Sequence, residues 1–230
     1  MKKFDELPLF LQTDTIKVYY DLLYQKRRQL YVKRLLDILV SGLLLLVLLP
    51  VFLFFAIWIK LDSPGPVFYR QERVTTYGKI FRIFKFRTMV VNADQQGSLV
   101  TLKEDQRITR VGQLIRKYRL DELPQLLNIL SGDMSLVGTR PEVQKYVDAY
   151  TDEMNATLLL PAGVTSKASI LFKDEEELME KYLLEGMTVD AVYIEKVLPE
   201  KMKYNVSYLR QFSFLTDIQL LVQTVFKVFK

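Results

Sequence analysis

The stretch ILVSGLLLLVLLPVFLFFAIWI, from Ile38 to Ile59, decides the expected fold. As a straight helix it would reach about 33 Å, enough to cross a hydrocarbon core of about 30 Å. Pro50 interrupts the run near its middle, and proline lacks a backbone donor and clashes with the carbonyl four residues earlier. We therefore predict a bend between Val47 and Pro50.

Basic residues flank this run on both sides. Positive residues near a membrane segment resist translocation, so a simple span carries them mainly on one side. Two basic flanks fit a re-entrant helix that enters and leaves the bilayer on the cytosolic face, and the length and hydropathy of the run fit one tilted span that tolerates its proline equally well. The run begins well inside the chain and lacks a small-residue cleavage site, which argues against a secretory signal peptide. The flanking cations are Lys26, Arg27, Arg28, Lys33 and Arg34 before the run, and Lys60, Arg70, Arg73, Lys79, Arg82, Lys85 and Arg87 after it.

The composition excludes several kinds of chemistry. The 230 residues include no histidine and no cysteine, so a histidine base, a thiolate nucleophile, a disulfide and an ordinary zinc site are excluded. Any catalysis must use carboxylates, hydroxyls, Lys, Arg or Tyr. The net charge of +5 is concentrated in the two flanks, whereas Asp174 to Glu200 is acidic. This asymmetry predicts an anionic lipid surface or a phosphate ligand, and no nucleic acid, as the partner.

The rest of the chain predicts a mainly α fold with a small β-hairpin. Residues 67–69 and 79–86 are rich in β-branched and aromatic residues and predict its strands, while the polar residues 90–104 predict a loop. Apolar residues recur at helical spacing on either side of Asp121. The expected divisions are an N-terminal membrane-surface segment (1–32), the re-entrant helix (33–61), a cytosolic α/β catalytic domain (62–211) and a C-terminal amphipathic helix (212–230).

The C-terminal segment, residues 212–230, alternates apolar and polar residues with the period of a helix. Such a helix can lie in the membrane interface with its apolar face in the lipid. Periodicity alone fits an ordinary core helix equally well.

Asp121 and Glu122 lie between two predicted helices, next to the basic residues Arg116 and Arg119. Aspartate is a preferred N-cap and Pro124 suits a first helical turn, so capping alone explains one carboxylate. The catalytic alternative is that this helix start holds a phosphate, while the two carboxylates bind a Mg²⁺ ion that carries substrate phosphates. Spacing alone leaves both readings open.

Three cations are candidate phosphate ligands. Arg140 follows two glycines in the loop from Gly132 to Pro141, where it can hold a phosphate with two parallel hydrogen bonds. Lys85 and Arg87 lie on and just after the second predicted strand. Contact with lipid headgroups explains these two residues equally well.

Four motifs in the same order and spacing resemble one known family, the bacterial sugar transferases, which are monotopic phosphoglycosyl transferases. The resemblance runs from about Lys33 to the C-terminus. The motifs are DSPGPVFYRQ at residues 62–71, KFRTM at 85–89, LDELPQ at 120–125 and GDMSLVGTRP at 132–141.

The resemblance implies an enzyme that moves a sugar 1-phosphate from a UDP-sugar to polyprenyl (undecaprenyl) phosphate and releases UMP. This reaction opens the synthesis of capsule, exopolysaccharide or O-antigen. By the same resemblance, Asp121 is the nucleophile that forms a covalent aspartyl-phosphosugar intermediate, and Glu122 assists. A carboxylate nucleophile agrees with the absence of His and Cys. Mg²⁺ together with Arg140 and Lys85 would neutralise charge on the transferring phosphoryl group.

The resemblance also favours re-entry over a plain span. The family's membrane segment bends at a proline, which corresponds to Pro50. The lipid phosphate lies at headgroup level and the UDP-sugar is in the cytosol, so Asp121 must meet both at one face. This places the protein in the bacterial inner membrane, with its catalytic domain on the cytosolic face and the bilayer as a partner.

The chain departs from the family pattern at three positions. Thr139 replaces a proline before Arg140, Thr75 replaces a glycine in the hairpin, and Leu160 replaces an arginine expected to meet substrate phosphate. The last departure supports an alternative function, a non-catalytic membrane module that recruits polysaccharide-assembly partners. A second alternative is a peripheral protein that binds anionic lipid electrostatically. The sequence specifies neither the sugar nor the pathway, and it leaves a homo-oligomer open.

Overall fold

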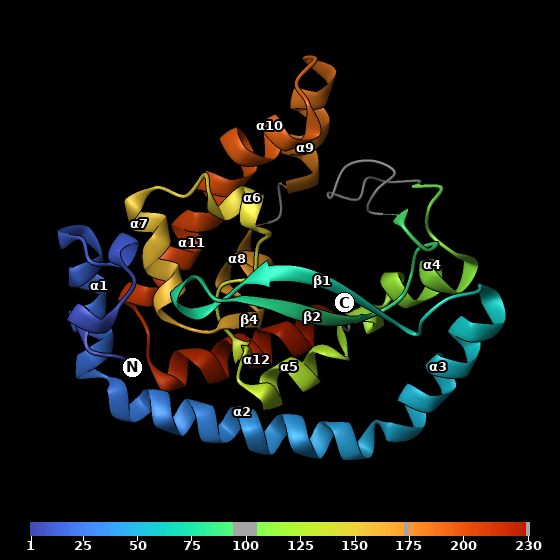
Figure 1. Cartoon of the computed structure of the whole chain (residues 1–230), viewed down its shortest axis with the longest axis horizontal. Coiled ribbons are helices and arrows are strands. Elements are labelled where there is room, and N and C mark those ends of the chain that lie inside the picture. Colours follow the sequence, from blue (N-terminus) through green and yellow to red (C-terminus); the bar gives the residue numbers. More distant parts are fainter. Residues whose placement is uncertain (94–104, 173–174, 229–230) are drawn as a thin grey trace.

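The computed structural model describes residues 1–93, 105–172 and 175–228. These residues form a mostly helical body with two small sheets (Figure 1). Most of the loop predicted at 90–104 lies outside the described residues.

The predicted hairpin is confirmed. Strand β1 (Phe68–Val74) pairs antiparallel with β2 (Ile80–Phe86) across the turn η3 (Thr76–Gly78), and Tyr69 lies opposite Lys85. The first strand is longer than predicted. A second sheet, which the sequence did not predict, pairs β3 (Met134–Val137) parallel with β4 (Ala162–Thr165). Its strands are four residues each, too short for a periodic pattern to stand out.

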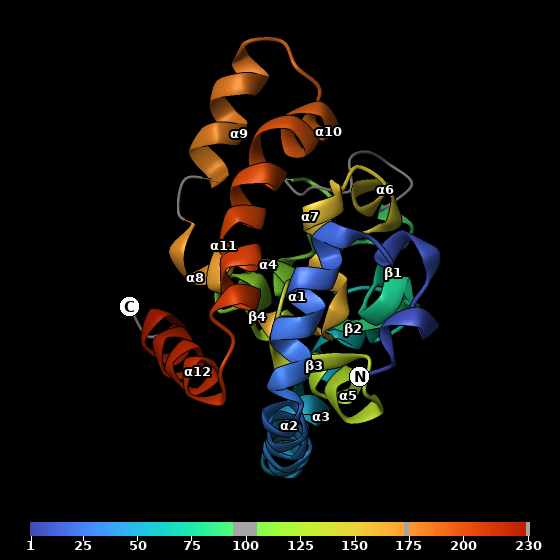
Figure 2. The ribbon, with the colours of Figure 1, turned by 90° about the vertical axis from the view of Figure 1, so that its left-hand side faces the viewer.

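Helices surround the two sheets. Helix α2 runs along one edge of the molecule, and α9 and α10 project from the opposite edge (Figures 1 and 2). The α-helices are α1 (Asp14–Gln25), α2 (Arg27–Val47), α3 (Leu49–Asp62), α4 (Arg110–Lys117), α5 (Gln125–Ser131), α6 (Gln144–Val147), α7 (Asp152–Asn155), α8 (Lys167–Leu171), α9 (Glu175–Leu184), α10 (Val189–Val192), α11 (Leu198–Arg210) and α12 (Phe214–Val228). The short helical turns are η1 (Phe4–Glu6), η2 (Leu9–Leu11), η5 (Leu120–Glu122), η6 (Ala156–Leu159) and η7 (Tyr193–Val197).

The apolar run is bent at the predicted place. Helices α2 and α3 meet at Leu48 with an angle of 61°. Pro50 falls in the first turn of α3, where its missing N–H is not needed. Within the described residues no single helix is long and apolar enough to cross a membrane, whereas this bent pair reaches that length and composition.

Helix α2 turns its polar side chains inward and its apolar side chains outward. Its buried residues are Lys33, Asp37 and Ser41, which are spaced four apart and so share one face. Leu30, Val40 and Leu45 also pack on the main core, so the inner face of α2 is mixed, whereas a helix on a soluble core usually turns an apolar stripe inward. The outward-facing apolar residues include Leu35, Ile38, Leu39, Leu43, Leu46 and Val47.

The inward polar row on α2 holds the C-terminal helix and the second sheet. Lys33 Nζ donates to Asp217 Oδ2 on α12 over 2.6 Å. The Tyr208 hydroxyl donates to the other oxygen of Asp217 over 2.6 Å. One turn further along α2, Asp37 accepts from the backbone N–H of Leu136 in β3 over 3.0 Å. The buried polar groups of α2 therefore fix the helix against two elements from the far end of the chain.

The N-terminal segment packs on the main hydrophobic core, where Leu11, Ile16 and Leu23 are fully buried. The expected position of residues 1–32 on a membrane surface stays a prediction. In addition, α2 already begins at Arg27. An amphipathic helix has the same periodicity on a membrane as on a protein core, so the pattern could not separate the two.

Helix α12 combines both environments that its periodicity allowed. Leu220 is buried and packs in the main core. Apolar residues on its other side are exposed, namely Leu215, Val222, Val225 and Phe226.

Replacing Asp217 with Asn is expected to destabilise the fold, because the buried ammonium of Lys33 then has no counter-charge. Breaking one partner of a buried pair costs about 3–5 kcal/mol, which lowers Tm by about 6–20 °C for a chain of this size. Thermal unfolding in detergent measures this. The matched control is Asp21→Asn, which breaks the exposed Lys17–Asp21 pair and should cost less than about 1 kcal/mol. Equal Tm values for both variants would contradict the prediction.

Candidate functional site

Asp121 and Glu122 share one helical turn, η5, between α4 and α5. Arg119 enters this turn in the left-handed conformation, with φ of 54°. The N-cap of α5 is Pro124 and carries no side-chain cap. Asp121 therefore does not cap the following helix, and the capping explanation fails for this structure.

Glu122 is held by two cations. The guanidinium of Arg140 donates to both of its carboxylate oxygens, and Lys85 Nζ donates to Oε1 over 3.2 Å. Burial favours the neutral carboxyl, but the charges and hydrogen bonds of Arg140 and Lys85 outweigh it and hold the pKa of Glu122 well below its usual range. Glu122 is thus a fixed negative charge that orients the two cations.

Asp121 is in a different position from its neighbour. Among the described residues, none donates a hydrogen bond to its carboxylate. Burial raises the pKa of this carboxyl above its ordinary value, and the charge of Lys85 opposes that rise. Two adjacent carboxylates with pKa values pushed in opposite directions indicate different roles, as seen where one group reacts and the other organises.

Helix α5 brings the hairpin over this turn. The side chain of Asn128 on α5 accepts from the backbone N–H of Phe84 over 2.8 Å and donates to the carbonyl of Arg82 over 3.0 Å. These bonds occupy the outer edge of β2, the strand that carries Lys85. The sequence analysis did not identify Asn128. The pattern that could have indicated it is a polar residue on the apolar face of a predicted helix.

Two glycines place Arg140. A Cβ atom on Gly138 would lie 2.5 Å from the carbonyl oxygen of Pro161, and one on Gly163 would lie 2.1 Å from the nitrogen of Gly138. Any side chain at either position would therefore force the backbones apart. The close approach lets the chain leave β3 and direct Arg140 toward Glu122.

A cleft of about 560 Å³, here called the main cleft, opens in front of Asp121. Its size is that of a ligand site, and its walls combine aromatic and basic side chains. The basic and aromatic residues that line it are Arg70, Arg73, Lys85, Arg87, Arg107, Arg116, Phe68, Tyr69 and Phe86. This lining suits a ligand with both phosphate groups and apolar or planar parts.

Arg87 has a structural role. Its Nη1 donates to the carbonyl of Pro64 and its Nη2 to that of Ser63, each over 2.6 Å, and Nη2 also reaches Ile59 over 3.4 Å. These carbonyls lie at the C-terminal end of α3. These hydrogen bonds fix the apolar helix pair to the wall of the main cleft. The expected binding of phosphate by Arg87 stays a prediction.

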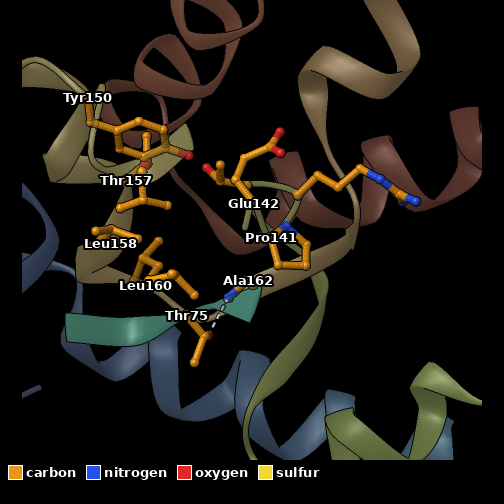
Figure 3. A pocket seen from close by; sticks show the side chains of 12 residues that line it. Thr75, Pro141, Glu142, Tyr150, Thr157, Leu158, Leu160 and Ala162 are labelled. Carbon is orange, nitrogen blue, oxygen red and sulfur yellow. Dashed lines mark hydrogen bonds between the residues drawn. The ribbon is translucent and has the colours of Figure 1, made fainter. Parts of the chain in front are cut away.

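Leu160, where the family pattern has an arginine, is buried in the main core. It lines a narrow space between Glu142 and Tyr150 (Figure 3). At about 10 Å³ this space has room for about one water molecule. Arg140 borders the same space, and its guanidinium is directed to Glu122.

Thr75 connects the hairpin to the second sheet. Its hydroxyl donates to the carbonyl of Asp133 over 2.7 Å and accepts from the N–H of Ala162 over 3.1 Å (Figure 3). The φ of Thr75 is −133°, which is extended backbone. A glycine is therefore not required at this position.

A magnesium ion would need ligands from the substrate as well as from the protein. Among the described residues there is no group of three or more acidic side chains, His or Cys that could hold a metal. Both oxygens of Glu122 already accept from Arg140, so the predicted ligation by Glu122 does not fit this geometry. Asp121 fits as one carboxylate ligand of an ion whose other ligands are substrate phosphates and water.

Residues 27–230 match the sequence model of a family described as bacterial sugar transferase. A UDP-N-acetylgalactosamine-undecaprenyl-phosphate N-acetylgalactosaminephosphotransferase of Aeromonas hydrophila is 35% identical over 198 residues, 85% of this chain and 43% of that protein. A UDP-glucose:undecaprenyl-phosphate glucose-1-phosphate transferase of Klebsiella pneumoniae is 34% identical over 201 residues, which are 86% of this chain and 40% of that protein. An undecaprenyl-phosphate galactose phosphotransferase of Salmonella typhimurium is 38% identical over 156 residues, which are 61% of this chain and 32% of that protein. The chain thus spans less than half of each relative.

The opposite environments of the two carboxylates can be measured by ¹³C NMR. The carboxyl of Asp121 is expected to titrate above the ordinary aspartate value of about 3.9, because burial disfavours its charged form. In Lys85→Met its pKa should rise further, since Lys85 stabilises the carboxylate. Asp121→Asn identifies the resonance, and Lys79→Met, an exposed lysine before the same strand, serves as the control. A lower pKa in Lys85→Met would refute this account.

Proposed function

Because the chain belongs to the bacterial sugar transferase family, we propose that it transfers a sugar 1-phosphate from a UDP-sugar to undecaprenyl phosphate and releases UMP. The observation that carries this proposal is Asp121, a carboxylate that no described residue engages, at the wall of a basic cleft. The three relatives above, whose names specify undecaprenyl phosphate and a sugar phosphotransfer, support the reaction class.

The transfer proceeds in two displacements. A carboxylate oxygen of Asp121 attacks the β-phosphorus of the UDP-sugar, the bond from that phosphorus to the bridging oxygen breaks, and UMP leaves with the bond electrons. A phosphate oxygen of undecaprenyl phosphate then attacks the same phosphorus and releases Asp121. Division into two steps avoids bringing both large substrates together at one moment.

The neighbours of Asp121 have supporting roles. Lys85 and Arg140 stabilise the negative charge that builds up on the phosphoryl oxygens. Glu122 holds these two cations in place, so it is a positioning residue and assists without touching phosphorus. A bound Mg²⁺ would supply further neutralisation of the pyrophosphate, with Asp121 as its protein ligand.

The bent helix pair is proposed to be re-entrant. The support is the outward apolar surface of α2 and α3 together with the inward polar row on α2. A pair that enters and leaves on one face places the main cleft at headgroup level, because Arg87 fixes the end of α3 to the cleft wall. The exposed apolar residues of α12 would enter the interface beside it.

This topology places the protein in the bacterial inner membrane, with the main cleft on the cytosolic face where UDP-sugars are dissolved. The product, an undecaprenyl diphosphate sugar, is the starting lipid for further sugar addition. The enzyme would thereby begin the synthesis of an exopolysaccharide, a capsule or an O-antigen.

Asp121→Asn is expected to lower UMP release by about a thousandfold or more, since an amide cannot act as the nucleophile. The assay combines detergent-solubilised protein, undecaprenyl phosphate, Mg²⁺ and a panel of UDP-sugars, and detects UMP. Exposed Asp148→Asn is the matched control. Full turnover by Asp121→Asn would exclude this nucleophile. Absence of UMP from every donor with the unmodified protein would favour the rival, a non-catalytic recruitment module.

Membrane insertion can be tested by introducing a charge at one exposed apolar position. Leu53 on α3 is exposed, so Leu53→Lys should weaken binding to vesicles by about tenfold or more. Leu184 on α9 is also exposed but projects from the opposite edge, so Leu184→Lys should bind as the unmodified protein does. Equal loss in both variants would contradict the proposed insertion.

Re-entry itself predicts that both ends of the chain lie on one face. Labelling of the N-terminus and of the C-terminal helix from either side of sealed vesicles should mark the two on the same side. Labels on opposite faces would contradict re-entry and support a single membrane-spanning helix.

A further inference from the structure

A second space adjoins the main cleft. It has a volume of about 130 Å³ and is here called the side hollow. Arg73 borders both spaces, and Arg140 links the side hollow to Glu122. The remaining polar lining is Glu142, Tyr146, Tyr193 and Lys201. Because Arg73 lies in both walls, the two spaces are neighbours.

The charges around the side hollow are paired at unusual distances. Arg73 Nη1 lies 3.8 Å from Glu142 Oε2, and Lys201 Nζ lies 3.7 Å from Glu142 Oε1. Both distances are too long for a hydrogen bond. Only 7% of Glu142 is exposed, and a buried carboxylate usually pairs closely with its cations. Among the described residues none donates a hydrogen bond to Oε2 of Glu142, so this oxygen can accept one from a ligand.

The tyrosines complete this lining. The Tyr193 hydroxyl donates to Glu142 over 2.6 Å and accepts from Lys201 over 2.9 Å. A ligand hydroxyl could bind in the same way, by donating to a carboxylate oxygen and accepting from an ammonium group. The Tyr146 and Tyr193 rings lie 4.5 Å apart and are tilted by 35° to each other, and the Tyr146 hydroxyl donates to Asp190 over 2.7 Å. The Tyr193 hydroxyl is thus the tyrosine oxygen that links Glu142 and Lys201.

These features discriminate among the parts of a UDP-sugar. A phosphate group only accepts hydrogen bonds, so it can bind Arg73, Arg140 and Lys201 but not the carboxylate of Glu142. A sugar ring carries several hydroxyls, and each hydroxyl both donates and accepts. Alternating acceptors and donors on the wall match that chemistry.

We propose that the side hollow is the subsite for the sugar ring of the donor, with Lys201, Glu142 and Tyr193 as residues that determine which sugar is accepted. This inference rests on the proposed function for the identity of the donor. A site built to hydrogen-bond hydroxyl groups discriminates strongly against analogues that lack them, because its buried polar groups are then left unpaired.

The test compares binding of donors with and without a sugar. Equilibrium affinities are measured in the Asp121→Asn background, where no turnover consumes the ligand, for UDP and for the UDP derivatives of glucose, galactose, N-acetylglucosamine and N-acetylgalactosamine. Adding Lys201→Met should weaken the best UDP-sugar by about tenfold or more, change the order of the four sugars, and leave the affinity for UDP within about twofold. Lys203→Met is the matched control, since this lysine is exposed on the same helix.

Tyr193→Phe provides a second variant that removes one oxygen atom, and thermal unfolding verifies that each variant is folded. It should weaken UDP-sugars selectively as well. Equal weakening of UDP and all UDP-sugars would assign the side hollow to the nucleotide and overturn the proposal, and so would unchanged sugar affinities in both folded variants. UMP release by otherwise unmodified protein is scored separately, so a failed reaction and a failed subsite are distinguishable.

Discussion

A buried row of polar side chains on α2 connects the apolar helix pair to the rest of the protein. Lys33 and Asp37 each find their partners on elements far along the chain, α12 and β3. Buried charges are stable only when they are paired and hydrogen-bonded, so this row specifies one orientation of α2. That orientation leaves the leucine-rich face of the helix without protein cover. The arrangement that stabilises the domain is thus also the one that leaves an apolar surface of α2 exposed.

A second constraint operates at the site. Glu122 binds Arg140 and Lys85, and these three charges come from a turn, a loop and a strand that are separate in the sequence. The arrangement costs nothing at the moment of reaction, because the cations are already oriented. It also gives the two adjacent carboxylates different environments. Both oxygens of Glu122 accept hydrogen bonds from Arg140 and Lys85, whereas no described residue donates to Asp121. Adjacent acidic residues can therefore take different roles when their neighbours differ.

Much of the architecture could be predicted from local patterns. The bend at Pro50 and the hairpin followed from the properties of proline and from the alternation of residues in the strand. The burial of the N-terminal segment and the parallel pairing of β3 with β4 could not, because both depend on contacts between distant segments. Arg87 belongs to the same class. Its sequence context fits phosphate binding and contact with lipid headgroups equally well, and only the position of α3 shows that its guanidinium bonds the end of that helix.

The sequence by itself determined the chemical inventory and the local geometry. It excluded His and Cys chemistry, placed Asp121 beside Glu122, and broke the apolar run at Pro50, since composition and backbone stereochemistry are properties of neighbouring residues. Only the tertiary structure decided which carboxylate is free, because the cations that occupy Glu122 arrive from other elements. It also created the side hollow, whose walls come from β1, the loop after β3, α6, η7 and α11. Long-range packing sets those distances, and no local pattern encodes them.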